Sequence, residues 1–222
     1  MNFDRLAPHY RWIEALFADG RLQRCRTSML DAISAPKRVL IYGEGNGRFL
    51  VELMRRFPQA AVTVVEASAV MIDLARSRLQ RDGLESAAVT FVQADALTWE
   101  PPASSFDLIV TCFFLDCFQE DQLQRLMPVI ANAATPDAQW LLADFQIAPS
   151  GLRRVRSRVI VGLLYAFFRL TTRIAARELV DVQPGLQAAG FTRVERREFD
   201  HGLLFCDWWS RGEIASQARR IT

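Results

Sequence analysis

Apolar runs of strand length alternate with segments of helical period through most of this 222-residue chain. The runs at 38–42, 61–66, 89–94, 106–112 and 138–144 have the length and the β-branched content of buried strands. Between them, apolar side chains recur every three or four residues, as they do on one face of a helix. Strands that alternate with helices pair in parallel, and the helices cover both faces of the sheet. The alternation therefore predicts an α/β fold.

Two segments interrupt this alternation. Residues 1–35 have the pattern of a helical lead-in, and residues 149–182 are too long for a simple connection between strands. We interpret the second segment as a helical cap inserted after the fifth strand. We expect one domain over residues 1–222, in which residues 36–148 form the core and residues 183–222 a closing helix and two strands.

A glycine-rich turn joins the first predicted strand to its helix. Gly43, Gly45 and Gly47 alternate with other residues there. Alternate glycines let the backbone turn tightly and let a ligand lie against its N–H groups. The helix that begins near Asn46 points its positive end at the same place. The turn favours an anionic or nucleotide-like ligand, although a glycine triplet is also compatible with a tight turn alone.

Acidic residues follow the next two strands. Glu66 ends the second strand, 19 residues after Gly47, where a carboxylate can accept both hydroxyls of a ribose. Asp95 follows the third strand, where it could bind an adenine amino group, with the backbone N–H of Ala96 beside it. Each carboxylate also has a simpler interpretation, as a strand end, a helix-cap contact or a turn residue. Together, and in this order, they indicate a nucleotide-type cofactor.

The chain here resembles the class I S-adenosylmethionine-dependent methyltransferases. The stretches VLIYGEGNG, VTVVEAS, VQADAL and FDLIVTCFFLDCF are similar to the family's first four motifs, within residues 39–145. The resemblance implies a Rossmann-like seven-stranded, mostly parallel sheet with an antiparallel last strand, and S-adenosylmethionine across its carboxyl edge. It also implies methyl transfer to a small molecule. The order of the motifs is specific for the cofactor and uninformative about the acceptor.

By this resemblance, ten residues form the cofactor site: Gly43, Glu44, Gly45, Gly47, Glu66, Ala67, Met71, Asp95, Ala96 and Phe113. One position departs from the family pattern. The family usually has an acidic residue two positions before the first glycine, and this chain has Ile41. Glu44, inside the turn, is the substitute that we expect for binding the cofactor's methionyl amine.

Three residues are candidates for the acceptor side. Asp116 has the best position for a general base, and Asp144 is the second candidate. A base is needed only if the acceptor must lose a proton, because the cofactor already carries a good leaving group. Tyr10 lies in an N-terminal lead-in that is similar to the lead-in of many small-molecule methyltransferases. In those proteins an aromatic residue covers the methionyl end of the cofactor. The alternatives are a helix cap or structural hydrogen bond for each aspartate, and simple packing for Tyr10.

The predicted cap helix, at residues 152–177, is apolar in its middle and rich in arginine at both ends. Its apolar residues recur at spacings of three and four: Val155, Val159, Leu163, Ala166, Phe167 and Leu170. Three interpretations stay open. The helix could pack on the core with its arginines in solvent, form a lid that admits an apolar or aromatic acceptor, or make peripheral contact with an anionic membrane surface.

Composition excludes several other classes of protein. Lys+Arg 27 against Asp+Glu 25 leaves a net charge of +2, so no basic field indicates nucleic-acid binding. The four cysteines show no zinc-ligand spacing, so we expect no metal, and a reducing compartment suits them. The longest apolar run, Val159 to Phe168, has ten residues, whereas a bilayer span needs about 20. We expect a soluble, cytoplasmic protein with a small-molecule acceptor; the oligomeric state is not predicted.

Three rival functions remain. A nicotinamide-dependent oxidoreductase shares the glycine turn and the ribose acid, but its glycines follow G-x-G-x-x-G, which this turn does not match. A non-catalytic module would bind S-adenosylmethionine without transferring the methyl group. A nucleic-acid methyltransferase is disfavoured by the near-neutral charge and by the tetrad CFFL after the fourth strand, where an N-P-P-Y-type motif would be expected.

Overall fold

The computed structural model describes residues 20–84, 88–172 and 178–212. Its strands are β1 Arg38–Tyr42, β2 Ala61–Glu66, β3 Val89–Gln93, β4 Phe106–Cys112, β5 Ala134–Phe145, β6 Thr192–Phe199 and β7 Leu204–Ser210. Its α-helices are α2 Arg21–Thr27, α3 Arg48–Arg56, α4 Ala69–Arg81, α5 Glu120–Ala133, α6 Gly151–Thr172 and α7 Gln183–Ala188. Two short 3₁₀ helices, η2 Leu115–Cys117 and η3 Asp200–Gly202, complete the described elements.

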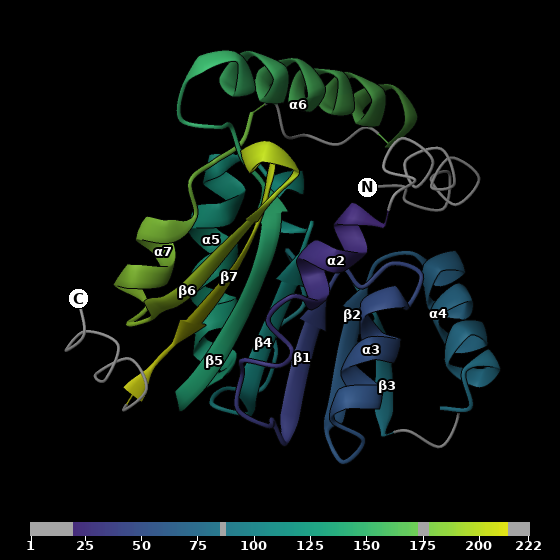
Figure 1. Cartoon of the computed structure of the whole chain (residues 1–222). Helices are drawn as coiled ribbons and strands as arrows, with labels where there is room; N and C mark the ends of the chain where they lie inside the picture. The colour runs from purple at the N-terminus through teal and green to yellow at the C-terminus, as the bar shows by residue number, and fades with distance from the viewer. Residues whose placement is uncertain (1–19, 85–87, 173–177, 213–222) are drawn as a thin grey trace.

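The seven strands form one sheet in the order β3-β2-β1-β4-β5-β7-β6 (Figure 1). Strands β1 to β5 pair in parallel, and β7 runs antiparallel to both of its neighbours, β5 and β6. The predicted α/β fold, with a seven-stranded and mostly parallel sheet whose last strand is antiparallel, is confirmed.

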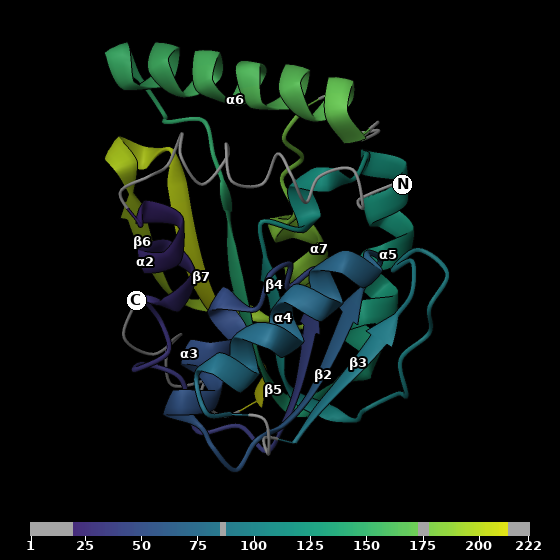
Figure 2. The same cartoon turned by 90° about the vertical axis from the view of Figure 1, so that its right-hand side faces the viewer.

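Helices cover both faces of the sheet, with α2, α3 and α4 on one face and α5 and α7 on the other (Figures 1 and 2). The alternation of side chains along each strand supplies both cores. In β1, Val39 and Ile41 join the core beneath α2 and α3, whereas Leu40 and Tyr42 join the core beneath α5. Because β1 is buried on both faces, its sequence is continuously apolar, which is why it could be predicted.

Two element boundaries differ from the prediction. Strand β5 begins at Ala134 instead of 138, because α5 runs directly into it and Ala134 pairs with Phe106 before a shift in register. The polar residues 135–137 give this start no apolar pattern. Helix α3 begins at Arg48, because Gly47 has a φ of 83° and cannot belong to a right-handed helix.

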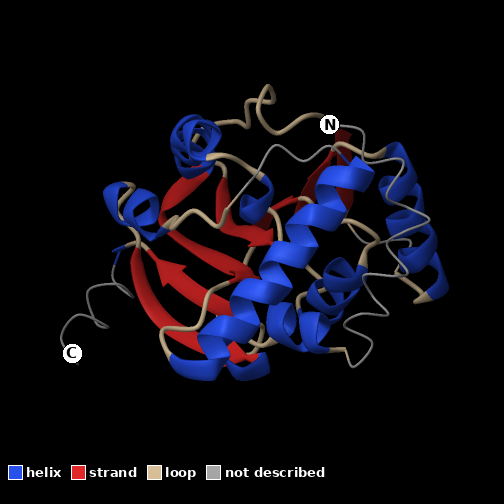
Figure 3. Ribbon diagram, turned by 90° about the horizontal axis from the view of Figure 1, so that it is seen from above, coloured by secondary structure: helices blue, strands red, loops and turns tan. Residues whose placement is uncertain are grey.

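The insert after β5 contains the long helix α6, which lies across the carboxyl ends of the strands (Figures 1 and 3). Several hydrogen bonds attach it: Tyr165 Oη donates to the carbonyl oxygen of Asp116 at 3.0 Å, Ser157 Oγ accepts from the N–H of Ala148 at 3.0 Å, and Arg156 pairs with Asp200. Neither α6 nor any other helix within the described residues has the length and apolar character needed to cross a membrane.

Candidate active site

The glycine turn is packed too tightly for any larger residue at two of its positions. Gly43, Gly45 and Gly47 have φ values of 64°, 68° and 83°. A Cβ on Gly43 would lie 2.5 Å from Cδ2 of Phe114, and a Cβ on Gly47 would lie 2.8 Å from Cα of Ala75. These glycines therefore serve the turn itself, by letting the chain pass close to the loop after β4 and to α4.

Glu66 connects this turn to the start of α4. Its Oε2 accepts the N–H of Gly45 at 3.1 Å, and its Oε1 accepts the N–H of Ser68 at 3.0 Å. Ser68 in turn caps α4, as predicted, by accepting the N–H of Met71 at 3.2 Å, and Ala67 is exposed between them. Each carboxylate oxygen has two lone pairs. Glu66 can therefore bind ribose hydroxyls in addition to the backbone.

Glu44 is buried at the N-terminal end of α3. Its Oε1 accepts the N–H of Leu50 at 2.9 Å, in the first turn of the helix. Burial raises the pKa of Glu44 to about 7, although the backbone N–H groups and the nearby Arg26 charge act to lower it. The observed contact is that of a helix-capping carboxylate. Its role toward a methionyl amine stays a prediction.

At the end of β3, Asp95 is exposed and makes a local turn. Its Oδ1 accepts the N–H of Leu97 at 3.0 Å, which is the simpler interpretation of an aspartate after a strand. Ala96, beside it, is buried in the core beneath α5. An exposed carboxylate at this edge is within reach of a ligand. Adenine binding by Asp95 and Ala96 therefore stays a prediction.

A buried cation that the sequence did not single out lies near Glu44. Arg26 of α2 is only 7% exposed, and its guanidinium lies over the ring of Phe113, 5.6 Å from the centroid. Its Nε donates to the carbonyl oxygen of Leu22 at 3.3 Å. Phe113 itself has a φ of 52°, which is strained for a bulky residue, and packs on Phe145. Together they place a buried positive charge near the ends of β1 and β4.

The two candidate aspartates lie together at the ends of β4 and β5. Asp144 Oδ2 accepts the backbone N–H of Asp116 at 3.2 Å, and its Oδ1 accepts the N–H of Phe145 at 2.8 Å. Burial raises the pKa of Asp116 to about 6. Burial, followed by the charge of Asp116, raises the pKa of Asp144 well above its ordinary value. The charge of one carboxyl group disfavours ionisation of the other.

A cavity of 250 Å³ opens beside these aspartates. Six apolar and six polar residues line it: Phe145, Ile147, Leu179, Val180, Val182 and Phe205, together with Asp116, Asp144, Gln146, Asp181, Gln183 and Arg196. The guanidinium of Arg196 is already paired with buried Asp207 through two hydrogen bonds of 2.7 Å. The carboxyl pair is therefore the reactive feature of this cavity.

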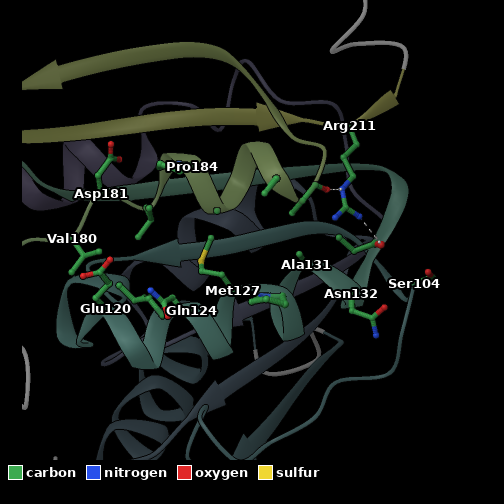
Figure 4. A pocket seen from close by; sticks show the side chains of 17 residues that line it. Ser104, Glu120, Gln124, Met127, Ala131, Asn132, Val180, Asp181, Pro184 and Arg211 are labelled. Atoms are coloured by element: carbon green, nitrogen blue, oxygen red, sulfur yellow. Dashed lines mark hydrogen bonds between the residues drawn. The ribbon is translucent and has the colours of Figure 1, made fainter.

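A larger cavity, of 730 Å³, follows the groove between α5 and α7 (Figure 4). Met127 and Ala131 line it from α5 and Pro184 from α7, while Arg211 donates to the carbonyl oxygen of Ala189 at 2.9 Å. Among the residues that the structure describes, none of those predicted for cofactor binding or catalysis lines it. The two cavities meet at residues 180–182, which line both.

The structure thus groups the predicted residues into two sets. Most of the cofactor set lies at or after the ends of β1, β2 and β3, whereas Phe113 and Asp116 follow β4 and Asp144 lies near the end of β5. Tyr10 lies outside the described residues. Sequence reasoning missed Arg26 and Tyr165, because neither belongs to a motif. Phe114, which follows Phe113, stacks on Tyr42 with 5.5 Å between ring centroids.

Comparisons with known proteins agree with this geometry. Residues 39–137 match the methyltransferase domain family. The chain is 31% identical over 151 residues, 67% of its length, to the demethylmenaquinone methyltransferase of Thermus thermophilus, and 31% identical over 153 residues, 68% of its length, to that of Deinococcus radiodurans. It spans 66% and 61% of these two relatives. The solved mitomycin 7-O-methyltransferase MmcR has the same fold, with a TM-score of 0.69, 19% identity and coverage of 95% of this chain and 60% of that one.

Proposed function

We propose that this chain, which belongs to the class I S-adenosylmethionine-dependent methyltransferases, methylates a small apolar or aromatic acceptor. The cofactor would lie along the ends of β1, β2 and β3, and the acceptor in the cavity beside Asp116 and Asp144. S-adenosylmethionine, when bound, supplies a methyl group on a sulfonium centre that departs readily. The protein's part is to hold the two reactants in line and to exclude water.

The observation that carries the proposal is the junction between Glu66 and the glycine turn. Glu66 holds the N–H of Gly45, so the ribose acid and the turn form one structure at one sheet edge. The chemistry of the surrounding donors fits the cofactor. Glu66 would accept ribose hydroxyls, and Asp95 would accept the adenine amino group. The buried guanidinium of Arg26 suits a carboxylate such as that of the methionyl group.

On the acceptor side, Asp116 and Asp144 would act as the proton-accepting pair. A carboxyl group whose pKa lies near neutrality is a suitable general base. The raised pKa values of both residues support this role. If the acceptor carries no acidic proton, the pair would orient it by hydrogen bonds instead.

Two observations support an apolar or aromatic acceptor. The cavity beside the aspartates is lined by Phe145, Ile147, Leu179 and Phe205. The two curated relatives are named for a quinone-type acceptor, demethylmenaquinone.

The first test is calorimetric titration with S-adenosylhomocysteine. The wild type should bind at micromolar concentration, and Glu66→Ala should lose binding. Glu52→Ala, which removes an exposed carboxylate from α3, is the matched control and should bind like the wild type. A wild type that binds NAD and ignores S-adenosylhomocysteine would replace the proposal with the oxidoreductase.

The second test concerns transfer itself. Incubation of the protein and S-adenosylmethionine with a lipophilic extract should produce a species 14 Da heavier, detected by mass spectrometry. The same product should be absent with Glu66→Ala. Cofactor binding without any such product, in lipophilic and polar extracts alike, would indicate the non-catalytic module.

A further inference from the structure

Helix α6 exposes a row of large aliphatic side chains. Leu152, Val155, Val159 and Leu163 are 89%, 61%, 56% and 65% exposed. Among the described residues, only Val70 and Leu74 of α4 are also large, apolar and exposed. The spacing of three, four and four places the four α6 residues on one side of the helix, which we call the outer face. Such concentrated exposure marks an interaction surface.

The opposite side of the same helix already packs against the protein. Val161, Leu164 and Tyr165 are buried, and Ser157 is hydrogen-bonded beneath the helix. These residues recur at the same three- and four-residue spacing, so α6 has two apolar faces. Only one of them can meet the sheet. The outer face is therefore not an unfinished part of the core.

The charge around the outer face has one sign. From Gln146 to Arg177 the chain contains seven arginines and no Asp or Glu. Arg153, Arg154 and Arg158 are exposed on α6, while Arg156 is paired with Asp200 at 3.0 Å. An aliphatic row beside unopposed guanidinium groups is complementary to a surface that is apolar inside and anionic at its rim. A bilayer rich in anionic lipid has this composition.

We propose that the outer face of α6 docks on an anionic membrane surface. Leu152, Val155, Val159 and Leu163 enter the boundary between headgroups and acyl chains, and Arg153 and Arg158, on the two flanks of this face, contact lipid phosphates. A nucleic acid suits this surface less well, because the centre of the face is aliphatic and offers no aromatic ring on which a base could stack.

The position of α6 connects this surface to the candidate active site. The helix lies over the carboxyl ends of the strands (Figure 3). Tyr165, on its inner side, donates a hydrogen bond to the carbonyl oxygen of Asp116. Docking would hold the acceptor cavity close to the bilayer, so that an apolar acceptor could enter from the lipid phase. This delivery rests on the proposed function, whereas the docking itself does not.

The experiment is flotation of the full chain with two kinds of vesicle, one of phosphatidylcholine alone and one with 30% phosphatidylglycerol. The wild type should float with the anionic vesicles and stay behind with the neutral ones. Val159→Glu/Leu163→Glu should bind the anionic vesicles at least about tenfold less. Arg153→Gln/Arg158→Gln should lose about fivefold for each arginine removed.

Leu74→Glu is the matched control, because it places the same charge at an exposed apolar position on α4. It should float like the wild type, and thermal unfolding should show that all variants are folded. Failure of the wild type to bind anionic vesicles, or unchanged binding by Val159→Glu/Leu163→Glu, would overturn the proposal. Sedimentation that shows a dimer abolished by this double variant would assign the face to a second copy instead. Because vesicle binding needs no cofactor, its outcome is independent of the S-adenosylhomocysteine titration.

Discussion

The two halves of the sheet's carboxyl edge are built in different ways. At the ends of β1 and β2, the carboxylates of Glu44 and Glu66 are held by backbone N–H groups from the nearby chain. At the ends of β4 and β5, Asp116 and Asp144 face each other beneath α6, a helix from another part of the chain. The first half is shaped by local turns, and the second by tertiary packing.

This difference separates cofactor binding from specificity for the acceptor. A site made of turns and strand ends depends on residues close in sequence, so it appears as motifs. A site closed by an inserted helix can change with the insert while the turns stay the same. The four effects below test this division, in decreasing order of expected size.

The largest effect is expected at Gly47. Gly47→Ala should lower the free energy of unfolding by about 3 kcal/mol, because it adds a strained φ and a Cβ 2.8 Å from the backbone of Ala75. Gly83→Ala is the control, since Gly83 also has a positive φ but open space around it, and it should lose only about 1 kcal/mol. If urea unfolding gave the same loss of unfolding free energy for Gly47→Ala and Gly83→Ala, the close approach of Gly47 to α4 would be unimportant for stability.

The second effect is on the pH dependence of stability. The pKa of Glu44 is raised from 4.5 to about 7, so the folded state binds more protons than the unfolded state in that window. Stability should therefore fall as pH rises from 4.5 to 7. Glu44→Gln should remove about 3 kcal/mol of this fall, measured by urea unfolding across pH.

Asp116→Asn provides the comparison from the other half of the edge. The pKa of Asp116 is raised from 3.8 to about 6, so this variant should flatten the curve at lower pH. If Glu44→Gln and Asp116→Asn flattened the dependence of stability on pH over the same pH range, or if neither flattened it, the two halves of the edge would not titrate separately.

The third effect concerns Arg26. Arg26→Met should weaken S-adenosylhomocysteine binding about tenfold to a hundredfold, because it would remove the proposed charged hydrogen bond to the amino-acid carboxylate of the ligand. Binding of methylthioadenosine, which lacks the amino-acid carboxylate, should stay unchanged. Calorimetry with both ligands separates the possibilities, since equal weakening of the two would mean that Arg26 only supports α2 and Phe113.

The smallest effect is expected at Tyr165. Tyr165→Phe removes the 3.0 Å hydrogen bond to the carbonyl oxygen of Asp116 and should cost about 1 kcal/mol. Hydrogen exchange should show faster opening of α6 with little change in β1 and β2. Leu163→Ala, on the exposed side of the helix, should change stability by less than about 0.5 kcal/mol. Opening of the whole sheet in Tyr165→Phe would contradict the division between the two halves.

The sequence predicted the first half of this edge well. The bounds of β1 and β2 match the predicted runs, because apolar residues make up most of both strands. Ser68 was predicted as a helix cap from its position alone, and it is one. Local chemistry determines such features, so they can be read from neighbouring residues.

The second half could not be predicted in the same way. Helix α6 has apolar residues on two faces, and its periodicity does not say which face is buried. Val155, Val159 and Leu163 were grouped as one apolar face, but they are exposed, while Val161 and Tyr165 meet the protein. Arg26 had no local signal, because its environment is created by the docking of α2 beside Phe113.

The position of β7 has a consequence for how the chain is made. During translation, β1 to β5 can pair as they leave the ribosome, but β6 has no neighbour until β7 follows it, because β7 lies between β5 and β6. Until then the apolar edge of β5 is open, and open strand edges are where nascent chains associate wrongly. The last strand to be synthesised is the one that seals the sheet, so a ribosome that stalls after residue 199 would leave a chain prone to aggregation.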